Sequence, residues 1–75
     1  MALEISEYSF TTDGLAQISQ HHYGRNWPIT YILQKNDQLY IGETTGGYGR
    51  LKNHFESKRE FRDGKVTLVT DSDFS

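Results

Sequence analysis

The stretch that decides the fold runs from Trp27 to His54 and reads WPITYILQKNDQLYIGETTGGYGRLKNH. It contains two runs that are rich in β-branched and aromatic residues, Ile29 to Gln34 and Leu39 to Glu43. Asn36 and Asp37 stand at the centre of the connection, and both residue types tolerate the backbone angles of a two-residue hairpin turn. The stretch therefore predicts a β-hairpin with a defined register.

This register decides which side chains share a face of the sheet. Counting outward from the turn, Tyr31 pairs with Gly42 and Leu33 pairs with Tyr40. Because side chains alternate between faces, these four residues share one face, and Tyr31 is a diagonal neighbour of Tyr40. Gly42 has no side chain, so we expect a concavity beside the phenols in which a ligand can approach the backbone. Glu43 falls on the opposite face.

A helix is predicted to follow, from Tyr48 to Lys58. One apolar stripe of this helix faces the sheet. It consists of Tyr48, Leu51 and Phe55, which are spaced i, i+3 and i+7. Arg50 and His54, at i and i+4, project from a flank of this stripe. They are close enough on the helix to contact one ligand together.

The start of this helix and its charges favour a phosphate ligand. Gly46 and Gly47 precede the helix, whose first backbone N–H groups attract phosphate oxygens. Residues 48–65 hold six Lys and Arg, Lys52 among them, against three Asp and Glu, which gives a net charge of +3. This is a modest positive charge for binding a polyanion. The alternative interpretation is that these charges form an ordinary solvated helix face. We assign Gly42, Gly46, Gly47 and Lys52 to substrate binding.

Together these residues resemble the GIY-YIG nuclease domains, a family named after two short strand motifs. Residues 29–31 (ITY) stand at the first motif, with a threonine that departs from the usual pattern, and residues 40–42 (YIG) reproduce the second. Arg50 and His54 follow at the family's spacing. The resemblance covers roughly Trp27 to Thr70, and the flanking sequence is similar to a bacterial subgroup in which such a domain precedes a P-loop ATPase or helicase-like region. No P-loop occurs in this sequence.

The resemblance implies hydrolysis of phosphodiester bonds in nucleic acid, with DNA favoured over RNA and neither decided. It implies that Tyr40 is the general base or positions water, and that Tyr31 is its partner at the phosphate or at a metal-bound water. Arg50 would stabilise the phosphoryl transition state, and His54 would bind phosphate or transfer a proton. Mg²⁺ or another divalent metal is the implied cofactor, held by a glutamate on a later helix.

No metal ligand is assigned within the chain. The last predicted strand, Lys65 to Thr70, is followed by residues that resemble the capped start of a helix, with Asp71 and Asp73 as helix-start residues. We expect the domain to be truncated before the metal-binding glutamate and cleavage to be absent from this fragment. Two interpretations stay open: the front of a metal-dependent endonuclease domain, or a noncatalytic nucleic-acid-binding or protein-interaction module on the same scaffold.

Length and composition indicate one small domain. The chain has 75 residues, no Cys and a formal net charge of −2. We predict an α/β fold with a small, mostly antiparallel three-stranded sheet flanked by helices. Residues 1–26 would supply an N-terminal edge strand and a helix from Gly14 to about Gln20 that Asp13 caps, and residues 27–75 the core. Adjacent His21 and His22 predict a helix end rather than a metal pair.

The surroundings of the domain can also be predicted. No apolar stretch approaches the roughly 20 residues of a membrane span, and the acidic start lacks the regions of a signal peptide. We therefore expect a cytoplasmic protein with no membrane partner. The sheet face left uncovered by truncation is expected to favour self-association.

Overall fold

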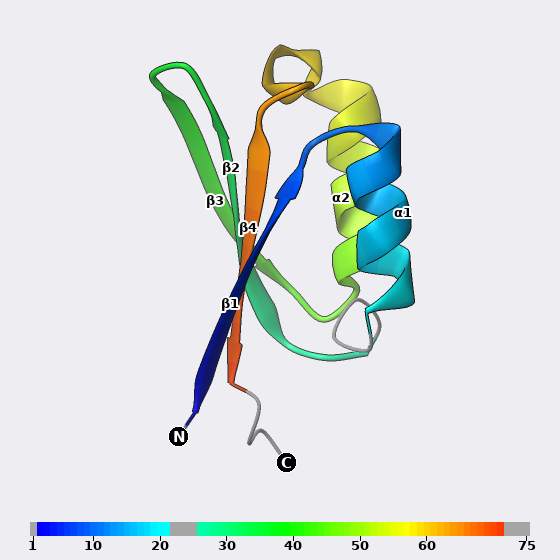
Figure 1. The fold of residues 1–75 in the computed structure, drawn as a ribbon, viewed down its shortest axis with the longest axis vertical. Helices are drawn as coiled ribbons and strands as arrows, with labels where there is room; N and C mark the ends of the chain where they lie inside the picture. Colours follow the sequence, from blue (N-terminus) through cyan, green and yellow to red (C-terminus); the bar gives the residue numbers. More distant parts are fainter. Residues whose placement is uncertain (1, 22–25, 72–75) are drawn as a thin grey trace.

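One antiparallel sheet carries the fold, and both helices lie against the same face of it (Figure 1). The computed structural model describes residues 2–21 and 26–71. The sheet has the order β1-β4-β2-β3, which gives an α/β fold as predicted, with four strands in place of three. Along the chain the elements are β1 (Leu3–Ser9), α1 (Thr12–Gln20), β2 (Ile29–Lys35), β3 (Gln38–Thr44), α2 (Gly47–Ser57), the 3₁₀ turn η2 (Arg59–Phe61) and β4 (Lys65–Asp71).

The additional strand is β1, which pairs with β4 over its whole length, from Leu3 opposite Asp71 to Ser9 opposite Lys65. The sequence predicted a short edge strand here and a sheet of three strands. Without β1, the outer side of β4 would be an open edge with a row of unpaired N–H and C=O groups. Pairing along all seven residues satisfies those groups and widens the sheet.

The start of α1 differs from the prediction by two residues. Thr11 is the N-cap, and its side-chain oxygen accepts a hydrogen bond from the Gly14 N–H at 3.1 Å. The predicted cap, Asp13, lies in the first turn instead, where its negative charge suits the positive end of the helix dipole. Leu15 and Ile18 are buried and direct the apolar side of α1 at the core.

The ends of two other predicted elements can be placed. His21 is the C-cap residue of α1, and its N–H donates to the Ile18 carbonyl, so the predicted helix end is confirmed there. His22 lies outside the described residues. Asp71 is the last residue of β4 and not a helix-start residue. The helix predicted to follow, with Asp73, falls at residues 72–75, outside the described part of the chain.

The core lies between the sheet and the two helices. The predicted stripe of α2 faces it, because Leu51 is fully buried and Phe55 packs edge-to-face on Phe10 with ring centroids 5.3 Å apart. The buried apolar residues are Phe10, Leu15, Ile18, Ile29, Tyr31, Leu33, Leu51, Phe61, Val66 and Leu68.

Within the described residues neither helix is long and apolar enough to span a membrane.

The other face of the sheet, which we call the open face, has no helix over it in the described chain (Figure 1). By the alternation along each strand it carries Leu3 and Ile5 from β1 and Leu39 and Ile41 from β3. These four side chains are between 58% and 65% exposed. The open face is thus the main exposed apolar surface of the described residues.

Candidate functional site

The β2–β3 hairpin places two phenols on the face that the helices cover. It pairs Tyr31 with Gly42 and Leu33 with Tyr40, which confirms the predicted register. Asn36 has a φ of 55°, the positive angle that the predicted turn requires. The Tyr31 and Tyr40 rings are stacked, with centroids 6.3 Å apart and an interplanar angle of 27°. The predicted diagonal contact is therefore present.

The space beside Gly42 is filled by the Tyr31 phenol. A Cβ atom added at Gly42 would collide with the Tyr31 hydroxyl and ring. The sequence predicted a concavity for a ligand at this position, and that expectation is wrong, because the ring folds across the strand onto its own cross-strand partner. Gly42 is needed to let the phenol lie there.

Helix α2 contributes the polar side of the site. The Tyr31 hydroxyl and His54 Nε2 are 2.8 Å apart and hydrogen-bonded. The Tyr40 ring also contacts the imidazole, edge-on with centroids 5.1 Å apart. Arg50 is exposed one helical turn before His54 and lies close enough to influence the Tyr31 phenol. The structure thus brings together the four residues to which a catalytic role was assigned.

The protonation states of the hydrogen-bonded pair follow from burial and from the nearby cations. Burial raises the pKa of the Tyr31 phenol above 10.0, and Arg50 opposes part of that rise. Burial lowers the pKa of His54 below 6.5, and the positive charges of Lys58 and Arg50 lower that pKa further. Near neutral pH the phenol therefore keeps its proton and the imidazole is uncharged. In the tautomer whose Nε2–H donates to the Tyr31 hydroxyl, the other ring nitrogen, Nδ1, can accept a proton.

Lys58 belongs to this group of residues and was not predicted as a site residue. Its Nζ lies over the Tyr40 ring, 4.3 Å from the centroid. The signal was available in the sequence, because Arg50, His54 and Lys58 are spaced i, i+4 and i+8 and so follow one flank of α2. We call this flank, with its three cationic or titratable side chains, the basic flank.

The four residues assigned to substrate binding are dispersed. Gly46 is the N-cap of α2, and its N–H donates to the Thr44 hydroxyl at 3.0 Å, so it is not open to a phosphate. Gly47 is buried in the first turn. Lys52 does not reach the basic flank: it lines a hollow of about 370 Å³ between α1 and α2 together with Phe55. The helix rotation of roughly 200° between positions 50 and 52 separates the two side chains.

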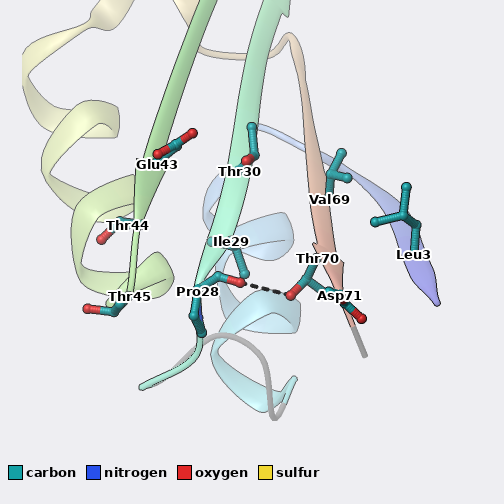
Figure 2. A pocket seen from close by; sticks show the side chains of 10 residues that line it. All are labelled: Leu3, Pro28, Ile29, Thr30, Glu43, Thr44, Thr45, Val69, Thr70 and Asp71. Atoms are coloured by element: carbon teal, nitrogen blue, oxygen red, sulfur yellow. Dashed lines mark hydrogen bonds between the residues drawn. The ribbon is translucent and has the colours of Figure 1, made fainter. Parts of the chain in front are cut away.

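The carboxylates of the neighbouring strands lie away from the phenols. Glu43 and Asp71 line a hollow of about 530 Å³ at the end of the sheet where β3 and β4 finish, on the side of the open face (Figure 2). The Thr70 hydroxyl closes one side of this hollow by donating to the Pro28 carbonyl at 2.8 Å. Among the described residues no three His, Asp or Glu side chains are grouped as a metal site.

Comparison with other proteins adds no identification of this site. No protein-family model, no curated protein and no solved structure matches the chain. The functional interpretation therefore depends on the contacts of Tyr31, Tyr40 and the basic flank.

Proposed function

We propose that this chain is a GIY-YIG nuclease-like domain that acts on the phosphodiester bonds of nucleic acid. The observation that supports this most is the 2.8 Å hydrogen bond between the Tyr31 hydroxyl and His54 Nε2. An uncharged imidazole is thereby held next to Arg50, an exposed cation, and Tyr40, a half-buried phenol. A proton acceptor beside a phosphate-binding cation is what phosphodiester hydrolysis requires.

Each residue has a role that its environment allows. Arg50 is exposed and can donate two parallel N–H bonds to phosphate oxygens. His54 can accept a proton from water, and the Tyr31 hydroxyl orients its ring. Tyr31 is only 1% exposed, so it is a positioning residue rather than one that touches the phosphate. Tyr40, which is half-buried, can position water with its phenol.

The divalent metal that the resemblance implies does not fit the described residues. Glu43 and Asp71 line the hollow near the open face, whereas the phenols lie under α2. The metal would supply activation of water and charge neutralisation at the phosphate. Phosphate binding at Arg50 and proton transfer at His54 are the parts of the reaction that the described residues supply.

The placement of these carboxylates favours a second candidate, a noncatalytic nucleic-acid-binding module on the same scaffold. Arg50 and Lys58 would bind the phosphates in either case, because neither cation depends on a metal. DNA as the preferred nucleic acid, a cytoplasmic setting and self-association through the open face are further parts of the proposal. The exposed apolar residues of the open face support the last of these.

Binding and cleavage of labelled 20-nucleotide DNA and RNA separate the two candidates. In EDTA we expect the protein to bind, and Arg50→Ala to lose about tenfold or more in affinity, since a charge-assisted hydrogen bond is worth about 1.5–3 kcal/mol. Lys65→Ala removes the same charge from the opposite face of the sheet, where Lys65 pairs with Glu7 at 3.3 Å, and should leave the affinity unchanged.

Adding Mg²⁺ or Mn²⁺ then tests catalysis. If the domain is a nuclease, Tyr40→Phe should retain affinity and cleave more slowly, because its phenol no longer positions the attacking water, and His54→Gln should lose roughly 10²–10⁴ in cleavage rate, the usual contribution of a general acid or base. Cleavage by the parent would decide for the nuclease, whereas binding without cleavage agrees with the noncatalytic module and with a nuclease domain in which no metal ligand is assigned. A parent that neither binds nor cleaves would contradict both candidates.

A further inference from the structure

Lys58 extends the site beyond the residues that the proposed function uses. It is the C-cap residue of α2, two helical turns after Arg50, and it is partly exposed. Its Nζ is held 4.3 Å above the Tyr40 ring, whose face attracts a cation. The ammonium group is thus positioned at the far end of the basic flank.

This ammonium group has hydrogen-bonding capacity left for a ligand. A lysine carries three N–H donors, and contact with an aromatic face does not use all of them. Within the described chain neither Lys58 nor Arg50 has a carboxylate at ion-pair distance, whereas Lys65 is paired with Glu7. Among the residues that the structure describes, no carboxylate therefore neutralises the charges of these two cations.

The spacing of the two residues along α2 indicates what kind of anion can use both. Eight residues separate their backbone positions, which is about 12 Å along the helix axis at about 1.5 Å per residue, and the two side chains flank His54, whose pKa both of them lower. A single phosphate cannot span that backbone separation. A nucleic-acid strand can, because in a duplex each strand carries one phosphate per roughly 3.4 Å of axis.

We infer that Lys58 is a second phosphate-binding residue of this site, which holds a phosphate of the same strand a few nucleotides from the phosphate at Arg50. The inference rests on the proposed function and deepens it: the site is suited to a polynucleotide that lies along the basic flank, and a mononucleotide would occupy only the Arg50 end. Tyr40 contacts both Lys58 and His54, so it ties the position of Lys58 to that of the proposed proton acceptor.

The salt dependence of binding tests this assignment without requiring catalysis. Affinity for a labelled 12-nucleotide single strand is measured by fluorescence anisotropy in EDTA at several NaCl concentrations. The logarithm of the affinity falls with the logarithm of the salt concentration, with a slope of about −0.7 per phosphate neutralised on a single strand. We expect Lys58→Gln to make the slope shallower by about 0.7 and to weaken binding at low salt. Lys58→Arg should retain the parental slope.

A dinucleotide supplies the second measurement, because we expect its one phosphodiester to occupy the Arg50 end of the basic flank without contacting Lys58. Binding of the dinucleotide, followed by NMR shifts, should be the same for the parent and Lys58→Gln. Lys65→Ala should keep the parental slope with the 12-nucleotide strand, and thermal unfolding establishes that each variant is folded.

The outcomes separate this inference from the proposed function. If the parent binds the 12-nucleotide strand and Lys58→Gln has the parental salt slope, the role of Lys58 is wrong while nucleic-acid binding stands. If Lys58→Gln loses as much affinity for the dinucleotide as for the 12-nucleotide strand, the inference is also overturned, since equal losses would indicate a general disturbance of the site. A parent that binds neither ligand overturns both proposals.

Discussion

The Tyr31 hydroxyl and His54 Nε2 are hydrogen-bonded at 2.8 Å although 23 positions separate the two residues in the chain. Tyr31 reaches this bond from the core, where it is 1% exposed, and His54 reaches it from the flank of α2. The bond therefore joins the packing of the domain to the protonation of its proposed proton acceptor. Substitutions around it should affect stability and site chemistry in ways that can be separated.

Tyr31→Phe keeps the ring and removes the hydroxyl. We expect the free energy of unfolding to fall by about 0.5–1.5 kcal/mol, the net contribution of one hydrogen bond, as measured by urea denaturation. Tyr8→Phe is the control, because the half-buried Tyr8 also packs against the core and no hydrogen bond to its hydroxyl is found in the described chain. Equal losses in the two variants would mean that the bond to His54 does not stabilise the fold.

Gly42→Ala tests how closely the Tyr31 phenol lies against β3. A Cβ at Gly42 would overlap the ring and hydroxyl of Tyr31, and the hydrogen bond to His54 holds that hydroxyl in place. We expect a loss of about 1–3 kcal/mol, the usual cost of overpacking a core. Gly49→Ala is the control, and it should change the stability in the opposite direction. Its Cβ would meet nothing within 4 Å inside α2, so it should stabilise by about 0.5–1 kcal/mol. Tolerance of Gly42→Ala would show that the phenol can leave Gly42.

Stability should depend on pH through His54. Its pKa in the folded state lies below 6.5, because of burial first and then of the charges on Lys58 and Arg50. The unfolded chain therefore binds a proton more readily, and the contribution of neutral His54 is full above about pH 6.5 and is lost as the pH falls toward the folded pKa. Urea denaturation between pH 7.5 and pH 5 should show this loss.

His54→Gln isolates that effect from the titration of the other histidines. The variant should have a smaller drop in stability between pH 7.5 and pH 5 than the parent, whatever its stability at pH 7.5. Parallel pH profiles for parent and variant would show that His54 titrates alike in the folded and unfolded chains.

The open face should support weak self-association. Four strands of seven residues, about 4.8 Å apart with about 3.3 Å per residue, cover roughly 440 Å². This area is below the roughly 800 Å² that each partner buries in a standard interface. We therefore expect the average mass in sedimentation equilibrium to rise only at high protein concentration, and Ile41→Lys to abolish the rise.

Gln38→Lys is the matched control for this prediction. It adds the same charge to an exposed position of β3, but on the other side of the strand from Ile41. It should associate like the parent. Loss of association in both variants would indicate a charge effect, and a parent that stays monomeric at all concentrations would refute the role of the open face.

Interactions between neighbours in the chain were predictable from the sequence. The pairing of Tyr31 with Gly42 follows from a two-residue turn and from alternation along the strands, both of which act over a few residues. The placement of Arg50 and His54 on one flank follows from the helical repeat, and the structure has α2 within one residue of its predicted bounds. The α/β class follows from the alternation of side chains along the strands and from the helical repeat.

Contacts across long sequence separations were decided by the tertiary structure. The pairing of β1 with β4 joins Leu3 to Asp71, and it depends on which strand edge is left open once β2, β3 and β4 have assembled. The apolar stripe predicts which side of α2 faces the sheet, but not what each flank meets: His54 meets Tyr31, and Lys52 lies in the hollow between α1 and α2. Core packing fixes this placement, because only the close fit of side chains from all elements selects it. Local sequence preferences act on one element at a time and carry no information about that fit.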